Sequence, residues 1–246
     1  MTINQMAKQT IDAKLFPGVV IGATNSKKSL YTKAFGTLDE RTETNSNSLY
    51  DIASLTKVTS TLPAVLKLVQ NGDIDLFDKV SEYIEFTDTE TMIWHLLTHT
   101  SGMPPYSSAY QHKNTREEIL YEIKMELFKE PPGKRVVYSC LNYILLMAIV
   151  DQITGNFKEF VTKEIFAPLG MDNTGYNPID KTNIAPTSQR KGAKLRGEPD
   201  DELAYYLGGV SGNAGIFSNL PDLLVYAREM LNPEKVFSRQ MIHTAT

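Results

Sequence analysis

The chain has 246 residues, and its 25 lysine and arginine side chains against 29 aspartate and glutamate side chains give a formal net charge of -4. This length allows one large or two small domains with a full core, and the hydrophobic content of 41% is ordinary for a soluble globular protein. This negative net charge gives no sign of a basic surface, so the sequence does not indicate a protein that binds nucleic acid. Cys140, the single cysteine, excludes an internal disulfide and a cysteine-rich zinc site.

The sequence shows neither a membrane-spanning segment nor a signal peptide. No apolar run reaches the length of a membrane span. The N-terminus also lacks the basic-then-apolar pattern of a signal peptide. The sequence as it stands therefore indicates a cytoplasmic protein, and a secreted or surface-attached protein if a signal segment has been removed from it.

The N-terminal part predicts a helix, a hairpin and a second helix. Residues 2–15 place apolar side chains on one side of a helix that stops at Pro17-Gly18. The apolar run 19–21 and the later apolar residues Leu30, Tyr31 and Phe35 flank a polar turn, which is typical of a β-hairpin. A polar connection then leads to an apolar helix that ends at Gly72. Because Pro63 removes a hydrogen bond inside this helix, we expect a bend over 59–63.

The rest of the chain is mainly helical by pattern. Helices are predicted over 92–97, 115–129, 142–154, 157–166 and 221–231, with a helix-like stretch from Ser238. In the second of these helices we expect Ile119, Ile123 and Leu127 to face inward. Residues 98–105 have turn chemistry and residues 177–202 predict a long polar surface excursion, whereas the glycine-rich residues 208–218 run into a strand.

The candidate chemistry lies at the head of the helix that ends at Gly72. Ser54 and Lys57 are one helical turn apart on the same face, within reach of a hydrogen bond. A serine hydroxyl needs a proton acceptor to attack a carbonyl, and a lysine can serve only when burial or other cations keep it partly neutral. The helix N-terminus would favour the resulting oxyanion. A second Ser-x-x-Lys match, Ser188 to Lys191, lies in a polar stretch and predicts a solvated loop.

Five separate segments resemble, in the same order, the serine hydrolases related to class C β-lactamases, D-alanyl-D-alanine carboxypeptidases and β-lactamase-fold esterases. They are YDIASLTK (50–57), LLTHTSGMP (96–104), PPG (131–133) before Tyr138-Ser139, PLGM (168–171), and GNAGIFS (212–218) before Asp222-Leu223. The resemblance covers essentially the whole chain. It implies an α/β fold in which a mainly antiparallel sheet is flanked by helices and carries an inserted all-helical lobe.

The resemblance also implies a division of the chain. Residues 1–72 would form the first part of the α/β lobe with the nucleophile helix, residues 73–172 the helical lobe, and residues 173–246 the return to the α/β lobe. The family's last element, Lys or His, then Thr or Ser, then Gly, has no good match. His243-Thr244-Ala245 imitates it without the glycine and is expected to be the tail of a helix. We therefore expect the sheet to need C-terminal strands beyond residue 246.

By the same resemblance, Ser54 would be the acylated nucleophile and Lys57 its proton partner, and Tyr138 would relay the proton to the leaving group. Cys140, Asn213 and Gly215 would lie where the family binds substrate. The implied substrate is a small-molecule or peptide acyl compound: an ester, a D-amino-acid amide or a β-lactam. No cofactor and no metal are implied.

The sequence departs from the family pattern in its substrate positions. Cys140 stands where the family commonly has asparagine or aspartate, and a thiol cannot offer the donor and acceptor of an amide. Asn142 is two residues farther along the helix, so it should point elsewhere. Asn213 stands where many relatives have histidine. These departures weaken the case for a β-lactam or peptide and leave an ester more credible.

Alternatives to a serine hydrolase remain open from the sequence. The first is a catalytically silent relative that binds a cell-wall peptide or a partner protein. Cys140 is a rival nucleophile, although it lacks a matched histidine. His95 and His99 have the i, i+4 spacing of zinc ligands without an evident third ligand. Residues 208–215 lack both phosphate-loop patterns, and no Gly-x-Ser-x-Gly nucleophile elbow occurs.

Overall fold

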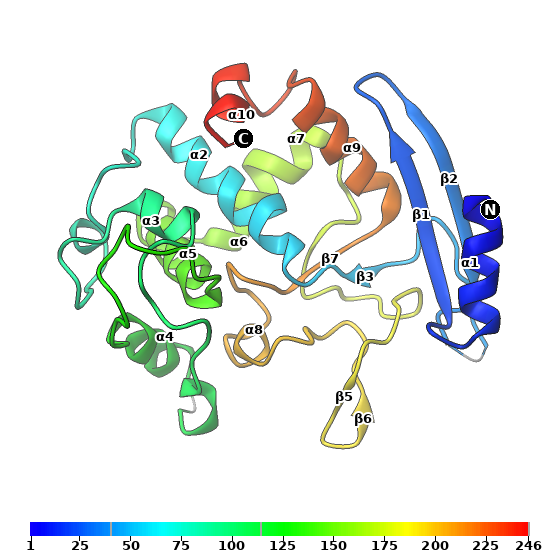
Figure 1. Cartoon of the computed structure of the whole chain (residues 1–246), viewed down its shortest axis with the longest axis horizontal. Helices are drawn as coiled ribbons and strands as arrows, with labels where there is room; N and C mark the ends of the chain where they lie inside the picture. Colours follow the sequence, from blue (N-terminus) through cyan, green and yellow to red (C-terminus); the bar gives the residue numbers. More distant parts are fainter. Residues whose placement is uncertain (40, 114, 246) are drawn as a thin grey trace. The chain divides into compact units, whose positions relative to one another are not determined.

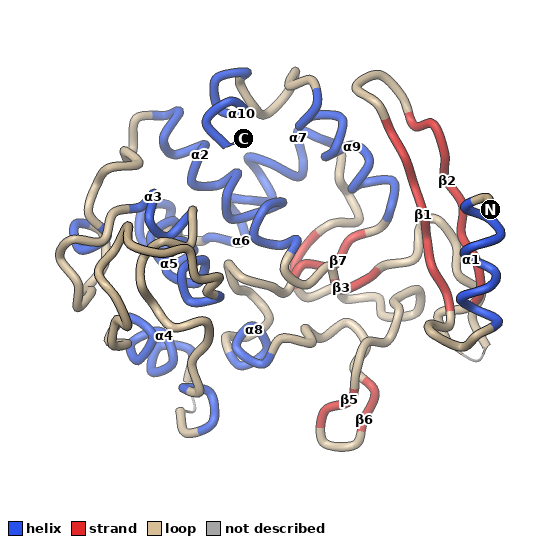
Figure 2. The backbone as a smooth tube through the Cα atoms, in the orientation of Figure 1, coloured by secondary structure: helices blue, strands red, loops and turns tan. Residues whose placement is uncertain are grey.

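The computed structural model describes residues 1–39, 41–113 and 115–245 (Figures 1 and 2). By their contacts the residues form two compact units. Unit 1 comprises Met1–Asp51, Phe166–Glu198 and Phe217–Thr246, and unit 2 comprises Ile52–Ile165 and Pro199–Ile216. The predicted division at residues 72 and 172 differs from these bounds, because Ser54 and the helical segments that follow it belong to the same unit.

Unit 1 begins with the predicted helix and hairpin, and both are confirmed. Helix α1 (Ile3–Asp12) starts with a capping box, in which Thr2 Oγ1 accepts from the Gln5 N–H and the Gln5 side chain accepts from the Thr2 N–H. Strands β1 (Gly18–Thr24) and β2 (Ser29–Gly36) pair antiparallel from Gly18↔Gly36 to Ala23↔Tyr31. The helix ends before residue 15 because Lys14 adopts a left-handed φ of 56°.

Helix α9 (Leu220–Leu231) packs on β1 in unit 1. A Cβ at Gly22 would lie only 2.8 Å from Leu220 Cδ1, so glycine allows this close approach. A short sheet has the strand order β3 (Tyr50–Asp51), β7 (Ile216–Ser218) and β4 (Gly175–Tyr176). The remaining elements are α7 (Ala167–Leu169), the hairpin β5 (Gln189–Arg190) and β6 (Ala193–Lys194), and α10 (Arg239–Ala245). Helix α10 confirms that His243-Thr244-Ala245 is helical.

Unit 2 is mostly helical around the buried helix α5 (Cys140–Thr154). Nine side chains of α5 are buried, from Leu141 to Val150, which explains why its pattern is apolar on every side. The other helices are α2 (Leu62–Asn71), α3 (Ile93–Leu97), α4 (Arg116–Lys124), α6 (Phe157–Val161) and α8 (Glu202–Tyr206), with 3-10 turns at Val80–Glu82 and Ala109–Gln111 and π-helical turns at Lys57–Thr61 and Thr162–Phe166. Among the described residues, no single helix has the length and hydropathy of a membrane span.

A π-helical turn, Lys57–Thr61, leads directly into α2, so Pro63 lies in the first turn of α2, where its missing N–H costs little. The bend expected over 59–63 stays a prediction. One local prediction in unit 2 needs correction. Helix α4 ends at Lys124 instead of residue 129. Leu127 therefore lies outside the helix and is 75% exposed, which makes its predicted inward orientation wrong.

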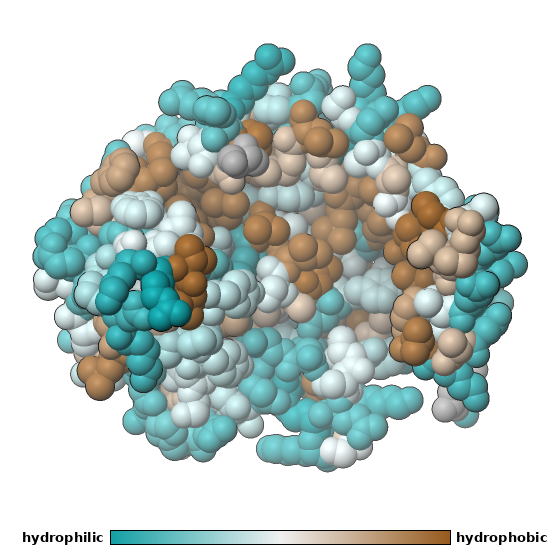
Figure 3. All heavy atoms as spheres, in the orientation of Figure 1, coloured by the Kyte–Doolittle hydropathy of each residue, from teal (hydrophilic) through white to brown (hydrophobic). Residues whose placement is uncertain are grey.

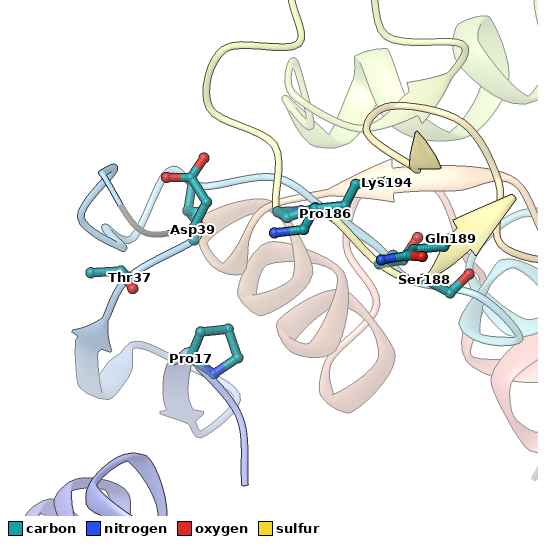
Figure 4. A pocket seen from close by; sticks show the side chains of 9 residues that line it. Pro17, Thr37, Asp39, Pro186, Ser188, Gln189 and Lys194 are labelled. Atoms are coloured by element: carbon teal, nitrogen blue, oxygen red, sulfur yellow. The ribbon is translucent and has the colours of Figure 1, made fainter. Parts of the chain in front are cut away.

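Unit 1 contains a cavity of about 360 Å³ (Figure 4). It is lined by Pro17, Thr37, Leu38, Asp39, Pro186, Thr187, Ser188, Gln189 and Lys194. The Asp39 carboxylate pairs with Arg196 and accepts the Arg41 and Thr42 N–H groups, and the Arg41 N–H and the Arg196 guanidinium hold its pKa well below the usual range. None of the predicted site residues belongs to this lining.

Candidate active site

Ser54 is presented by a sharp turn between a strand and a helical segment. The Ile52 N–H donates to Ile216 O at 3.0 Å, which holds the chain just before the turn. Ala53 then adopts a left-handed φ of 46°, a conformation that L side chains rarely adopt. The Lys57 N–H donates to Ser54 O at 3.1 Å and starts the helical turn. Ser54 is exposed as a result, immediately ahead of the π-helical turn.

Lys57 is the buried partner of Ser54, with only 3% of its surface exposed. Its Nζ donates to Ser54 Oγ at 3.1 Å and to Asn213 O at 2.9 Å, and it lies 3.7 Å from Cys140 Sγ. No carboxylate of the described residues forms an ion pair with this amine, which is held by a hydroxyl, a carbonyl and a thiol. Such a lysine is positioned to exchange a proton with the serine.

Tyr138 reaches Ser54 from the exposed side. Its phenol donates to Ser54 Oγ at 2.9 Å, while 51% of the residue remains exposed. The Lys57 Nζ lies 4.9 Å from the centre of the Tyr138 ring, within the range of a cation–π contact. The structure therefore brings together Ser54, Lys57 and Tyr138, as predicted for the catalytic group.

His99 also borders this group, although the sequence suggested only a turn or a metal ligand. Its ring lies 4.6 Å from that of Tyr138 and 5.2 Å from that of Tyr143, and its Nδ1 accepts the Ser139 N–H at 3.2 Å. Burial and, secondarily, the charge of Lys57 lower the pKa of His99 to about 4, so it is neutral at pH 7. The sequence signal for His99 was the segment LLTHTSGMP (96–104), which does not predict that the histidine ring packs against that of Tyr138.

The two histidines do not form a metal site. His95 Nδ1 accepts the Met92 N–H at 3.0 Å, whereas His99 faces the tyrosines. Burial lowers the pKa of His95, and the charge of Asp88 partly opposes this effect. Within residues 1–39, 41–113 and 115–245, no group of three histidine, cysteine, aspartate or glutamate side chains could hold a metal ion.

Cys140 is the first residue of α5, and its N–H donates to Pro105 O at 2.9 Å. Burial raises the pKa of its thiol, and the charge of Lys57 partly opposes this shift. Asn142 cannot substitute for the amide that Cys140 lacks. It is fully buried, and its Oδ1 accepts the Ser101 hydroxyl at 2.7 Å, so it points elsewhere as expected.

Asn213 and Gly215 lie on the glycine-rich segment next to the lysine. Asn213 is fully buried; its carbonyl accepts from Lys57, and its Oδ1 accepts the Ser211 hydroxyl at 2.7 Å. Gly215 has a φ of 111°, and the following N–H, of Ile216, donates to Thr56 Oγ1 at 3.2 Å. Asn213 therefore contacts Lys57 through its backbone carbonyl, which orients the lysine amine.

The glycine-rich segment is a close-approach turn, as its sequence indicated. A Cβ at Gly212 would lie 1.9 Å from Tyr143 O and 2.8 Å from Met147 Cβ, so only glycine allows this contact with α5. Thr61 Oγ1 donates to Gly212 O at 2.8 Å. The glycine-rich segment is therefore held by α5 on one side and by Thr61 on the other.

The second Ser-x-x-Lys match is a surface feature, as predicted. It covers β5 and the start of the turn to β6, and Ser188 and Lys191 are exposed there. Lys191 takes a φ of 51° at the hairpin turn. Hydrophilic side chains cover this hairpin in the space-filling view (Figure 3).

Comparison with known proteins identifies the family. The β-lactamase family model matches residues 3–245. The chain belongs to the β-lactamase family. A provisionally named D-alanyl-D-alanine carboxypeptidase from Escherichia coli (strain K12) is 31% identical over 278 aligned positions, which cover 94% of this chain and 64% of the relative. The chain thus spans about 64% of the length of that curated relative.

Solved structures show the fold of this β-lactamase family member. The octameric penicillin-binding protein homologue from Pyrococcus abyssi superposes with a TM-score of 0.81 at 23% identity, over 98% of this chain and 58% of its own. The β-lactamase/D-alanine carboxypeptidase from Pseudomonas syringae gives a TM-score of 0.81 at 21% identity, over 98% of this chain and 67% of its own. The predicted β-lactamase/transpeptidase-like fold of helices and antiparallel sheets is confirmed. Further strands beyond residue 246 stay a prediction.

Proposed function

We propose that this β-lactamase family member is a serine hydrolase that works through an acyl-enzyme on Ser54. One observation carries the proposal: Ser54 Oγ lies 3.1 Å from Lys57 Nζ and 2.9 Å from the Tyr138 hydroxyl. A nucleophile between two groups able to move protons is the arrangement that acyl transfer needs. A protein that only binds a partner has no physical need for all three side chains.

The proposed reaction has two halves. In the first, Ser54 Oγ attacks the acyl carbonyl, the amine form of Lys57 takes the serine proton, and the Tyr138 hydroxyl donates a proton to the leaving group. The proton that Lys57 took from Ser54 then passes to the phenolate of Tyr138. In the second half, water gives one proton to the same pair and attacks the acyl-serine. The bond between the acyl carbon and Ser54 Oγ breaks, the pair returns the proton to Ser54 Oγ, and the acid is released. The Ser54 backbone N–H, at the start of the helical turn, would stabilise the oxyanion in both halves.

The substrate class is an acyl compound: an ester, a D-amino-acid amide or a β-lactam. The carboxypeptidase name of the 31% identical relative supports the amide. The chemistry of Cys140 supports the ester, because a thiol beside Lys57 cannot offer an amide's paired donor and acceptor to a substrate carbonyl. The proposed chemistry requires no cofactor.

Intact-protein mass spectrometry tests the proposal. The parent protein and Ser54→Ala are each incubated with a fluorophosphonate and, separately, with a penicillin. We expect a single adduct on the parent and none on Ser54→Ala, and the faster reagent indicates ester-like or peptide-like chemistry. If the folded parent forms no adduct with either reagent, the hydrolase proposal fails and the catalytically silent alternative takes its place.

A further inference from the structure

Tyr138 lies in a segment that no regular element holds. Within the described chain, residues 134–139 belong to neither a helix nor a strand, and 51% of Tyr138 is exposed. Its hydroxyl nevertheless donates to Ser54 Oγ at 2.9 Å, the contact on which the proposed proton transfer depends. A half-exposed phenol has several orientations open to it, so a neighbouring group must select this one.

His99 contacts the chain on both sides of Tyr138. The Val137 N–H donates to His99 O at 2.8 Å, and the Ser139 N–H donates to His99 Nδ1 at 3.2 Å. The imidazole ring packs against the phenol ring, with 4.6 Å between the ring centres and 43° between their planes. One residue thus holds the backbone before and after Tyr138 and also limits the direction of its ring.

His99 is itself held in one orientation. Its Nδ1 also accepts from Asn142 Nδ2 at 3.3 Å, and Asn142 is fully buried on α5. The backbone of His99 is left-handed, with a φ of 58°, directly after the end of α3. Ending a helix there requires only a residue that tolerates this conformation, and glycine or asparagine does so more readily. Helix termination therefore does not account for an imidazole at position 99.

The two N–H groups that point at Nδ1 require a neutral imidazole with its lone pair on that nitrogen. Burial and the charge of Lys57 lower the pKa of His99 to about 4, so this form is present at neutral pH. The ring bonds to Ser139 and Asn142 and packs on Tyr138. The shortest path from His99 to the nucleophile therefore leads through the phenol of Tyr138.

We infer that His99 is a positioning residue that holds the Tyr138 hydroxyl on Ser54 Oγ. The inference deepens the proposed function and rests on it, because Tyr138 is there the proton donor to the leaving group. A phenol misplaced by about 1 Å transfers its proton far less often, since the transfer needs hydrogen-bond distance. His99 should therefore act on kcat and leave substrate binding largely unchanged.

Two substitutions at position 99 separate the imidazole from the backbone turn. Glycine and asparagine both tolerate the left-handed conformation, but only asparagine offers an acceptor to the Ser139 N–H. With p-nitrophenyl butyrate, we expect His99→Gly to lower kcat about 30-fold with KM within about twofold of the parent, and His99→Asn to lower kcat only about threefold. An asparagine variant as slow as the glycine variant would overturn the inference.

His95→Asn is the matched control. His95 also accepts a backbone N–H through Nδ1, that of Met92 at 3.0 Å, but its ring packs on Trp94. We expect kcat of this variant to equal that of the parent. A loss as large as that of His99→Gly would show that removing either histidine loosens the unit, and the specific role of His99 would be refuted.

A double-mutant cycle tests whether His99 acts through the phenol. Tyr138→Phe removes the hydroxyl that His99 is inferred to position, whereas the ring remains. In this background His99→Gly and His99→Asn should each cause no further loss of kcat, because the group through which they act is gone. A loss as large as in the parent background would give His99 a general structural role and overturn the inference.

Crystal structures separate this inference from the proposed function, because they need no turnover. We expect the Tyr138 hydroxyl to lie within hydrogen-bond distance of Ser54 Oγ in the parent and in His99→Asn, and beyond it in His99→Gly. An unchanged contact in His99→Gly overturns the inference whether or not the protein hydrolyses esters. If the phenol moves but the parent hydrolyses no ester and forms no adduct, the hydrolase proposal fails and the positioning of Tyr138 by His99 stands.

Discussion

At the scale of single residues, the candidate site depends on hydrogen bonds to one oxygen, Ser54 Oγ. Lys57 approaches it from the protein interior and Tyr138 from the exposed side, at 3.1 and 2.9 Å. Because Lys57 is buried and Tyr138 is half exposed, removing each functional group affects folding differently. Activity and stability can therefore be measured separately for the two residues.

Lys57→Met keeps the length and apolar stem of the side chain but removes the amine. We expect the second-order rate of fluorophosphonate labelling to fall by about 10³, because Ser54 loses its proton acceptor. The loss of the hydrogen bond to Asn213 O should cost about 1 kcal/mol of stability. Mass spectrometry measures the labelling rate, and an unchanged rate in a folded variant would remove Lys57 from the mechanism.

Tyr138→Phe removes only the phenol. We expect kcat for ester hydrolysis to fall by about 10², with little change in Tm, because this half-exposed hydroxyl contributes mainly to proton transfer. Tyr121→Phe is the matched control, since Tyr121 is 53% exposed on α4 and should leave kcat unchanged. Equal effects of the two substitutions would contradict the role of Tyr138.

Cys140 should react slowly near neutral pH. Burial raises the pKa of its thiol, so the reactive thiolate is scarce at pH 7 and increases as the pH rises through that higher value. Alkylation by iodoacetamide, followed from pH 7 to 10, should therefore show a midpoint above that of the unfolded chain. Lys57→Met should raise the midpoint further, because the amine's charge opposes the shift. A midpoint below that of the unfolded chain would instead support Cys140 as a rival nucleophile.

At the scale of elements, the periodic segments were predictable and the irregular ones were not. The apolar patterns located α1, the β1–β2 hairpin, α3, α5 and α9, because each buries one face or its whole circumference. The π-helical turn Lys57–Thr61 and the early end of α4 left no periodic signal. In the site, spacing paired Ser54 with Lys57, whereas the approach of Tyr138 depends on tertiary packing and was expected only from the family resemblance. The packing of His99 against Tyr138 was not predicted.

One element is stabilised by a single carboxylate, that of Glu229 on α9. It accepts the N–H groups of residues 234–237, which follow the helix. Burial raises its pKa, but these four backbone bonds together outweigh burial and lower the pKa below its usual value. A lowered folded pKa contributes stability that is fully present above the unfolded pKa and is lost as the pH falls through the folded value.

The effect of Glu229→Gln on the unfolding free energy should therefore depend on pH. We expect the variant to lose about 1–3 kcal/mol of unfolding free energy at pH 7, because an amide accepts these N–H bonds less well than a carboxylate. The difference from the parent should shrink below pH ~4, where glutamate protonates in the unfolded chain. Urea denaturation at pH 7 and pH 3 measures both values, and a difference that does not depend on pH would contradict the account.

At the scale of the whole molecule, the chain passes between its two units repeatedly. The crossings are Asp51–Ile52, Ile165–Phe166, Glu198–Pro199 and Ile216–Phe217. Each unit is thus assembled from segments far apart in the sequence. Composition and periodicity could not reveal this arrangement. The order of five family segments indicated the overall fold because it records the topology of the relatives.

The repeated crossings predict cooperative unfolding. Trp94, the single tryptophan, belongs to unit 2, whereas far-UV circular dichroism reports on helices of both units. We expect the two signals to give the same urea midpoint, because neither unit is a continuous stretch of chain that could unfold alone. Separate midpoints would show that the units are independently stable.

The left-handed backbone at Ala53 has a consequence for how such a site can evolve. Glycine adopts this conformation without strain, so Ala53→Gly is an accessible route to a more relaxed fold. The same change would widen the range of orientations open to Ser54, and its hydroxyl would meet Lys57 and Tyr138 less often. Because glycine also adds conformational freedom to the unfolded chain, the left-handed alanine holds Ser54 in place at a small cost in backbone strain.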